Sequence, residues 1–180
     1  MSVINILNPS DKKILPQYLP ETYLPQTSIW GSFISTTSRQ VYGSNIPTHM
    51  GNIVVVESSG IDVSGLSDEQ IVVSTAGVYK YSYSLQLDKS GGGTSPCDLW
   101  IRLNNQDVSN SASQVVVVGP AGETFPFCEY LLSLNAGDAI TLMFASSDNS
   151  MTGTAFPLQT SPYNRPAIPS LIVNMYKIAG

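Results

Sequence analysis

Residues 76–88, which read AGVYKYSYSLQLD, limit the possible fold more than any other stretch of the sequence. Large apolar and polar side chains alternate along it, and this period of two is typical of a half-buried β-strand rather than a helix. One face of the strand would carry Tyr79, Tyr81, Tyr83, Leu85 and Leu87. Such a tyrosine stripe suits sugar stacking, a subunit interface or a core, and its continuation into two leucines favours burial.

Other segments show the same short, β-branched or alternating character and are separated by Gly, Pro, Asn and Ser. We expect strands over 29–41, 52–58, 70–73, 97–104, 114–118, 125–134, 139–146 and 170–178. With 76–88 these make eight or nine strands, and no helix is predicted. The pattern predicts an all-β, antiparallel β-sandwich or jelly-roll domain over residues 28–180.

Residues 1–27 differ from the rest, because LPQYLPETYLPQ (15–26) holds three Leu-Pro pairs. Proline fixes φ and restricts the preceding residue to extended conformations, so a long helix is excluded. The segment could be a disordered linker, but it carries more apolar surface than a linker needs. We interpret it as an extended arm that anchors the chain to a neighbouring protein through Leu15, Pro16, Tyr18, Leu19, Pro20, Tyr23, Leu24 and Pro25.

Charge excludes several classes of partner. Only 12% of residues are charged, the net charge is −5, and no cluster of Lys or Arg exists. Because nucleic-acid binding requires cations against the phosphates, direct binding is not expected. No apolar run approaches 18 residues, so no membrane span is expected either. A surface so poor in charge favours packing against copies of the chain or against other proteins.

The two cysteines do not form a disulfide framework. Cys97 and Cys128 each alternate in register with apolar neighbours, which favours two reduced thiols in the core. A single bridge across the sandwich is the alternative.

The sequence offers no convincing catalytic set. His49 is the only histidine, and no Gly-x-Ser-x-Gly motif accompanies it. A Cys128–His49 pair is conceivable, although Cys128 is expected to point into the core. Asp62, Asp68 and Glu69 could bind Ca²⁺ through their oxygen atoms, but the favoured interpretation is a solvated acidic loop. The glycines of 90–96 are interpreted as a loop between strands. We therefore predict no enzyme, no metal and no cofactor.

Several motifs resemble the jelly-roll family shared by tumour necrosis factor (TNF) and the complement globular head. Ala76-Gly77-Val78-Tyr79 resembles that family's Pro-Gly-x-Tyr start of a strand. The stretch 99–105 resembles its Leu-x-Lys-Asn-Gly strand and turn, and Leu132 to Asp138 resembles its Leu-x-Leu-x-x-Gly-Asp signature. In that family the jelly rolls assemble as trimers around a sheet face.

A more specific resemblance is to virion-associated proteins of bacteriophages and large DNA viruses. The shared motifs, in order, are Gly31-Ser32-Phe33-Ile34-Ser35-Thr36-Thr37, Leu87-Asp88-Lys89 with Gly93-Thr94, Asp98-Leu99-Trp100-Ile101-Arg102 and Leu132 to Asp138. The chain departs from that group at Leu103-Asn104-Asn105, where Lys-Asn-Gly is usual, which leaves the turn type open. Residues 1–27 have no counterpart in the group.

The resemblance implies a structural virion protein, a capsid-associated homotrimer acting as a minor capsid, decoration or spike subunit beside other capsid proteins. The alternative is an attachment module that binds a host receptor or glycan through the loops 60–69, 105–113 and 147–168. Trp100 and Arg102 alternate with Leu99 and Ile101 and so face outward. An exposed tryptophan with few charges nearby suits an oligomer interface.

Overall fold

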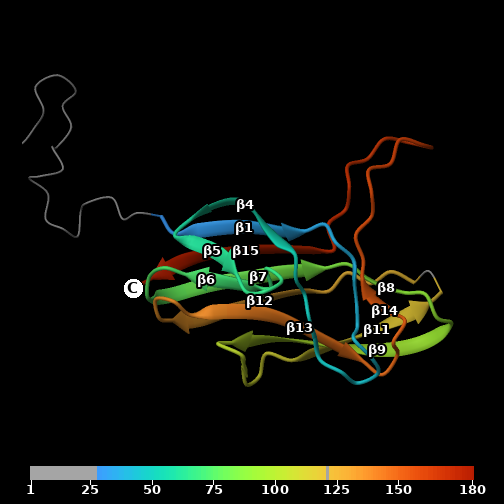
Figure 1. The fold of residues 1–180 in the computed structure, drawn as a ribbon, viewed down its shortest axis with the longest axis horizontal. Coiled ribbons are helices and arrows are strands. Elements are labelled where there is room, and N and C mark those ends of the chain that lie inside the picture. The colour runs from blue at the N-terminus through green and yellow to red at the C-terminus, as the bar shows by residue number, and fades with distance from the viewer. Residues whose placement is uncertain (1–27, 121) are drawn as a thin grey trace, which may run out of the picture.

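Two antiparallel sheets pack face to face in the part of the chain that the structure, a computed structural model, describes: residues 28–120 and 122–180 (Figure 1). Every strand pairing in this part is antiparallel, and it contains no helix. The predicted all-β sandwich is therefore confirmed. The predicted arm over 1–27 lies outside the described residues.

The strands are β1 Trp30–Ser35, β2 Arg39–Gln40, β3 Thr48–His49, β4 Ile53–Ser59, β5 Ile61–Ser64, β6 Gln70–Val73, β7 Gly77–Leu85, β8 Leu87–Lys89, β9 Gly93–Leu103, β10 Gln106–Asp107, β11 Ser113–Gly119, β12 Phe127–Leu134, β13 Ala139–Ser146, β14 Met151–Gly153 and β15 Leu171–Ala179. The five-stranded sheet has the order β12-β7-β15-β1-β4. The larger sheet has the order β10-β9-β13-β6-β5, with β11 on β9 and β3 on β13, and a small third sheet has the order β2-β14-β8.

The four loops predicted from the sequence are all partly strand, since 105–113 contains β10 and 147–168 contains β14. The other two errors lie at glycines. The glycine stretch 90–96 was expected to be irregular, but β9 already begins at Gly93 and pairs with β11. The expected loop 60–69 contains β5, because Gly60 adopts a φ of 71° and lets the chain turn sharply out of β4. Ile61 is then buried in the other sheet. Both errors arise because glycine favours a turn without saying how short the turn is.

The tyrosine stripe of β7 lies in the core. Tyr79, Tyr81 and Tyr83 are almost fully buried, and the ring of Tyr130 stacks on Tyr83 with centroids 6.3 Å apart. Burial raises the pKa of the Tyr83 phenol, since the charged form would have to leave water. The core interpretation of the stripe is therefore correct, and these rings are not a sugar platform.

Both cysteines are free. Cys97 is buried, and burial raises the pKa of its thiol to about 12, so it behaves as a small apolar residue. Cys128 is half-buried, and its Sγ lies 3.7 Å from the Ser113 Oγ. The predicted pair of reduced thiols matches this arrangement.

Gly31 shows why the first shared motif needs a glycine. An ideal Cβ at this position would overlap the ring of Phe33, which is fully buried in the core. The ring therefore occupies the space that any other side chain at position 31 would take. Such covering of a strand glycine by a neighbouring aromatic ring fixes the ring's place in the core.

We expect Gly31→Ala to lower the free energy of unfolding by about 1–3 kcal/mol, because the added methyl group must displace the Phe33 ring or bend β1. Urea unfolding at a fixed protomer concentration measures the effect. Ser32→Ala, one residue along on the opposite face of β1, is the matched control and should change stability little. Equal stability of the two variants would contradict the packing described above.

Candidate functional site

The outward face of the five-stranded sheet, called here the outer face, carries rows of side chains that run across the strands. The strand registers align Phe127, Ser84, Ile172, Ile34 and Val54 in one row. A second row aligns Leu131, Lys80, Tyr176, Trp30 and Ser59. Between them lie the polar Glu129, Ser82, Asn174, Ser32 and Glu57. The outer face is therefore two largely apolar rows that flank a polar one.

Large apolar side chains on the outer face are open to solvent. Phe127 is 62% exposed and Leu131 is 66% exposed, and Val54 and Tyr176 are also exposed. Lys80 and Glu129 neutralise each other at 2.5 Å, and the Lys80 ammonium lies 5.8 Å from the centre of the Tyr176 ring. Exposed apolar rows with little net charge are typical of protein–protein interfaces.

The outer face was not predicted from the sequence. The sequence does contain an indication of this face. Several strands have large apolar residues at both odd and even positions, as in IVVV (53–56), FCEYLL (127–132) and LIVNMY (171–176). A strand with one solvated face should alternate, whereas apolar residues on both faces indicate a second buried surface.

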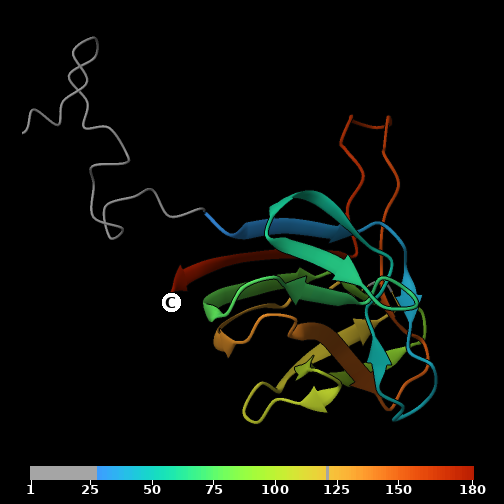
Figure 2. The same ribbon diagram turned by 60° about the vertical axis from the view of Figure 1, so that its left-hand side comes forward.

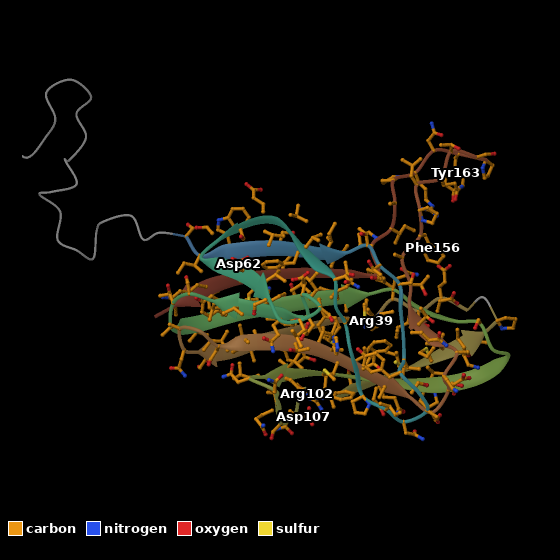
Figure 3. The ribbon with its side chains drawn as sticks, in the orientation of Figure 1. Arg39, Asp62, Arg102, Asp107, Phe156 and Tyr163 are labelled. Carbon is orange, nitrogen blue, oxygen red and sulfur yellow. The ribbon has the colours of Figure 1, made fainter. Side chains whose placement is uncertain are left out.

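Trp100 and Arg102 lie on β9 of the larger sheet, at positions that alternate with the buried Leu99 and Ile101. Figure 3 shows Arg102 beside Asp107, on the side of the molecule away from β1 and β4. The indole Nε1–H of Trp100 donates to the Asp107 Oδ1 at 2.7 Å, and the Nε–H of Arg102 donates to the same oxygen at 2.6 Å. These bonds hold the pKa of Asp107 below its usual range, with the bond from Arg102 the largest cause. The outward orientation agrees with the sequence, and the role of both residues in an oligomer stays a prediction.

His49 lies beside Tyr42, not beside a nucleophile. Its Nε2 is 2.8 Å from the Tyr42 hydroxyl, which also accepts a bond of 3.1 Å from the Arg39 Nη1. The strand of His49 belongs to the larger sheet, while Cys128 lies on β12 of the five-stranded sheet. The conceivable Cys128–His49 pair is therefore not brought together.

Two of the three acidic residues considered for Ca²⁺ accept hydrogen bonds from the local backbone. Asp62 accepts from the Val63 N–H at 2.8 Å, and Glu69 accepts from the Ser67 N–H at 2.7 Å. Across 28–120 and 122–180, no group of three or more His, Cys, Asp or Glu residues gathers in a metal-binding arrangement. Within the same residues no helix is long and apolar enough to cross a membrane.

Two shared motifs meet at one turn. Asn104 and Asn105 have φ values of 51° and 65°, which makes the turn between β9 and β10 of the type I′ kind. The Asn104 Nδ2 donates to the Asp138 Oδ1 at 2.8 Å, and the Asn104 Oδ1 accepts from the Ala139 N–H at 2.9 Å. The Asn-Asn turn and the Asn-Ala-Gly-Asp turn therefore hold each other, which settles the turn type that the sequence left open.

A third motif residue, Lys89, is a buried cation. Its side chain is 1% exposed, and its Nζ lies 2.7 Å from the Asp148 Oδ2. The ammonium also donates to the carbonyl oxygens of Gly91 and Gly92, at 3.3 and 2.6 Å. Asp148 in turn accepts from Ser150 and Ser95. This network fastens the glycine loop to the chain between β13 and β14.

A long hairpin, residues 155–169, projects from the sandwich between β14 and β15 (Figure 2). It rises past the β1 and β4 side of the molecule in both views (Figures 1 and 2). Figure 3 places Phe156 near its base and Tyr163 near its far end. The hairpin belongs to the loop 147–168 that the sequence suggested for attachment.

The strand order and the two facing sheets define a TNF-like jelly-roll fold. Murine APRIL at pH 8.0 superposes with a TM-score of 0.51 over 84% of this chain and 99% of APRIL, at 11% sequence identity. Eiger TNF from S. frugiperda superposes with a TM-score of 0.52 over 86% of this chain and 94% of Eiger, at 10% identity. At such identities the likeness concerns the fold alone.

No protein-family model matches the sequence, and no curated protein matches it. The family resemblance stated from the motifs is thus supported at the level of the TNF-like fold.

Proposed function

We propose that the protein is a structural virion protein, a capsid-associated jelly-roll subunit that works as a homotrimer. The oligomer is proposed because of the outer face. Its exposed apolar rows would be stabilised by burial against another subunit. TNF-like jelly rolls assemble around a sheet face, and a closed ring of three would bury the same face on every subunit. Trp100 and Arg102 form the second candidate interface.

The virion role rests on the order and spacing of the shared motifs. Gly31, Lys89 and Asp138 each have a structural task in this fold, namely close packing, a buried ion pair and a locked turn. A chain that has these residues in the same order as the virion-associated group is expected to have the same domain architecture. The role as a minor capsid, decoration or spike subunit is proposed on that ground.

Attachment is proposed to reside in residues 1–27. The anchoring residues between Leu15 and Pro25 lie outside the described residues, so this part of the proposal rests on the sequence. Tyrosine and leucine side chains on a proline-stiffened chain lose little entropy when they dock into pockets of another capsid protein. The first described residues precede β1, whose Trp30 belongs to the second row of the outer face.

Deletion of residues 1–27 should leave a folded trimer that no longer joins particles. Light scattering at micromolar concentration measures the oligomer, and co-sedimentation with particles that lack the protein measures incorporation. Full-length protein with Leu19→Ser and Leu24→Ser is the milder companion variant and should bind weakly. Normal incorporation of the truncated chain would refute the anchor, and a monomeric full-length protein would refute the trimer.

A second candidate function, attachment to a host glycan or receptor, is favoured by the projecting hairpin. The hairpin contributes nothing to the core, since its Leu158 and Tyr163 are 65% and 64% exposed. A projecting, self-supported segment is a common place for recognition on a rigid scaffold. The structural role and the attachment role are compatible within one virion protein.

A further inference from the structure

The projecting hairpin keeps its shape through its own hydrogen bonds. Phe156 and Ile168 exchange two backbone bonds of 2.9 Å, and Gln159 and Arg165 exchange two of 3.1 and 3.0 Å. Farther out, the Gln159 Nε2 donates to the Tyr163 carbonyl at 3.5 Å. A segment that is ordered from within, away from both sheets, presents a preformed surface to a partner.

Arg165 is a half-buried cation that is already held in place. Its Nη1 donates to the carbonyl oxygens of Pro157 and Pro166, both at 3.1 Å. These two bonds use both hydrogens of Nη1, and within 28–120 and 122–180 no hydrogen bond engages Nε or Nη2. Among the described residues, the carboxylate ion pairs are those of Lys80, Lys89 and Arg102, and none involves Arg165.

Arg165 is the only charged residue of the hairpin. Between Asp148 and Lys177 it is the only charged residue of the chain, within a protein whose net charge is −5. The hairpin is therefore a local positive point on an acidic protein. A planar guanidinium edge with two parallel N–H groups matches a carboxylate in a bidentate pair.

Arg165 is one of the residues that line a pocket of about 420 Å³, together with Leu158, Gln159, Thr160, Asn164 and Pro166. Its walls combine two apolar side chains with two amides and one hydroxyl. Apolar patches suit the C–H face of a sugar ring, while amides and hydroxyls can bond several sugar hydroxyl groups in either direction. An acidic peptide would need more cations than the single one present.

We propose that this pocket binds a carboxylate-bearing sugar, with the carboxylate on the Nε–Nη2 edge of Arg165. The amides of Gln159 and Asn164 bond the ring hydroxyl groups, and Leu158 and Pro166 contact the C–H face. The exposed ring of Tyr163 contacts the next sugar along the glycan. This inference rests on the attachment function and names its ligand class. Sialic acids and uronic acids share the required chemistry.

The test uses the full-length protein and titration calorimetry with sialyllactose, sialyllactose methyl ester, lactose and a uronic-acid disaccharide. We expect one or both acids to bind. The methyl ester and lactose should bind with an affinity lower by about tenfold or more. The ester removes the charge on the ligand side, so the result does not depend on whether a variant folds. The pattern between the two acids tells which source of carboxylate the pocket prefers.

Arg165→Gln should weaken binding of the acid by about tenfold or more, and Arg165→Lys should not restore it, because a lysine lacks the paired N–H groups. Arg39→Gln is the matched control, since Arg39 is also half-buried and lacks a carboxylate partner among the described residues. It should leave binding unchanged.

Equal binding of acid, ester and lactose would overturn the proposal, as would the absence of any binding at millimolar sugar. Binding of a polyglutamate peptide without binding of acidic sugars would overturn it in favour of an acidic polypeptide. Trimer mass and particle incorporation are measured on the same variants, so failure of the sugar site is distinguishable from failure of the structural role.

Discussion

Phe127→Glu is expected to convert the proposed trimer into monomers at micromolar concentration. Phe127 stands in the apolar row whose register partners across the sheet, from Ser84 to Val54, carry no charge. A carboxylate there would be buried in the assembled face without a cation, which costs several kcal/mol. Each 1.4 kcal/mol weakens association tenfold, so dissociation should rise by about 100-fold or more. Light scattering over a dilution series measures it.

Two further variants show which surface is used. Leu66→Glu adds the same charge at a fully exposed leucine between β5 and β6, away from the outer face, and should leave the trimer intact. Trp100→Ala removes the side chain on which the sequence-based interface prediction depends. Dissociation by Trp100→Ala but not by Phe127→Glu would assign the contact to β9 and refute the outer-face interface.

The alternation in 76–88 was enough to place the three tyrosines in the core, because a period of two assigns each side chain to a face without any knowledge of the partner strands. Parity also predicted that Trp100 and Arg102 point outward. The outer face was missed for the converse reason. Where both faces of a strand are apolar, as in 127–132, parity no longer tells the core side from the interface side, and only the register across strands separates them.

The motifs predicted the fold better than they predicted a site. Each conspicuous motif residue serves the domain itself: Gly31 makes room for Phe33, and Asn104 locks the turn of Asp138. Arg165 carried no such signal, because its neighbours Pro157 and Pro166 hold it through backbone carbonyl groups, which the sequence does not distinguish. Residues that serve packing or turns can thus be recognised from patterns in the sequence. A single cation held by backbone carbonyl groups can be recognised only in the structure.

The buried pair of Lys89 and Asp148 should respond asymmetrically to mutation. Asp148→Asn leaves the ammonium of Lys89 buried with only neutral carbonyl partners, which is the strongly destabilising way to break such a pair. We expect the melting temperature at pH 7 to fall by roughly 10 °C. Lys89→Met instead removes the buried charge, while the partly exposed Asp148 keeps its bonds from Ser95 and Ser150.

Lys89→Met should therefore be the milder change, and adding Lys89→Met to Asp148→Asn should recover most of the lost stability. Thermal unfolding of the four proteins at one protomer concentration completes the double-mutant cycle. If Asp148→Asn were as stable as the wild type, the carboxylate would not be what compensates the buried ammonium.

Acid should erase the difference between wild type and Asp148→Asn. The hydrogen bond from Lys89, followed by those from Ser150, holds the pKa of Asp148 well below its usual range. A carboxyl group whose pKa is lowered by folding stabilises the folded state above its unfolded pKa, which is about 4, and loses that contribution as the pH falls toward the folded pKa. The wild type should thus lose stability below about pH 4, while Asp148→Asn, which has no carboxyl group to protonate, loses less. Melting temperatures of both proteins between pH 7 and pH 2 measure the gap. A gap that stayed constant over this range would show that the ion pair is not its cause.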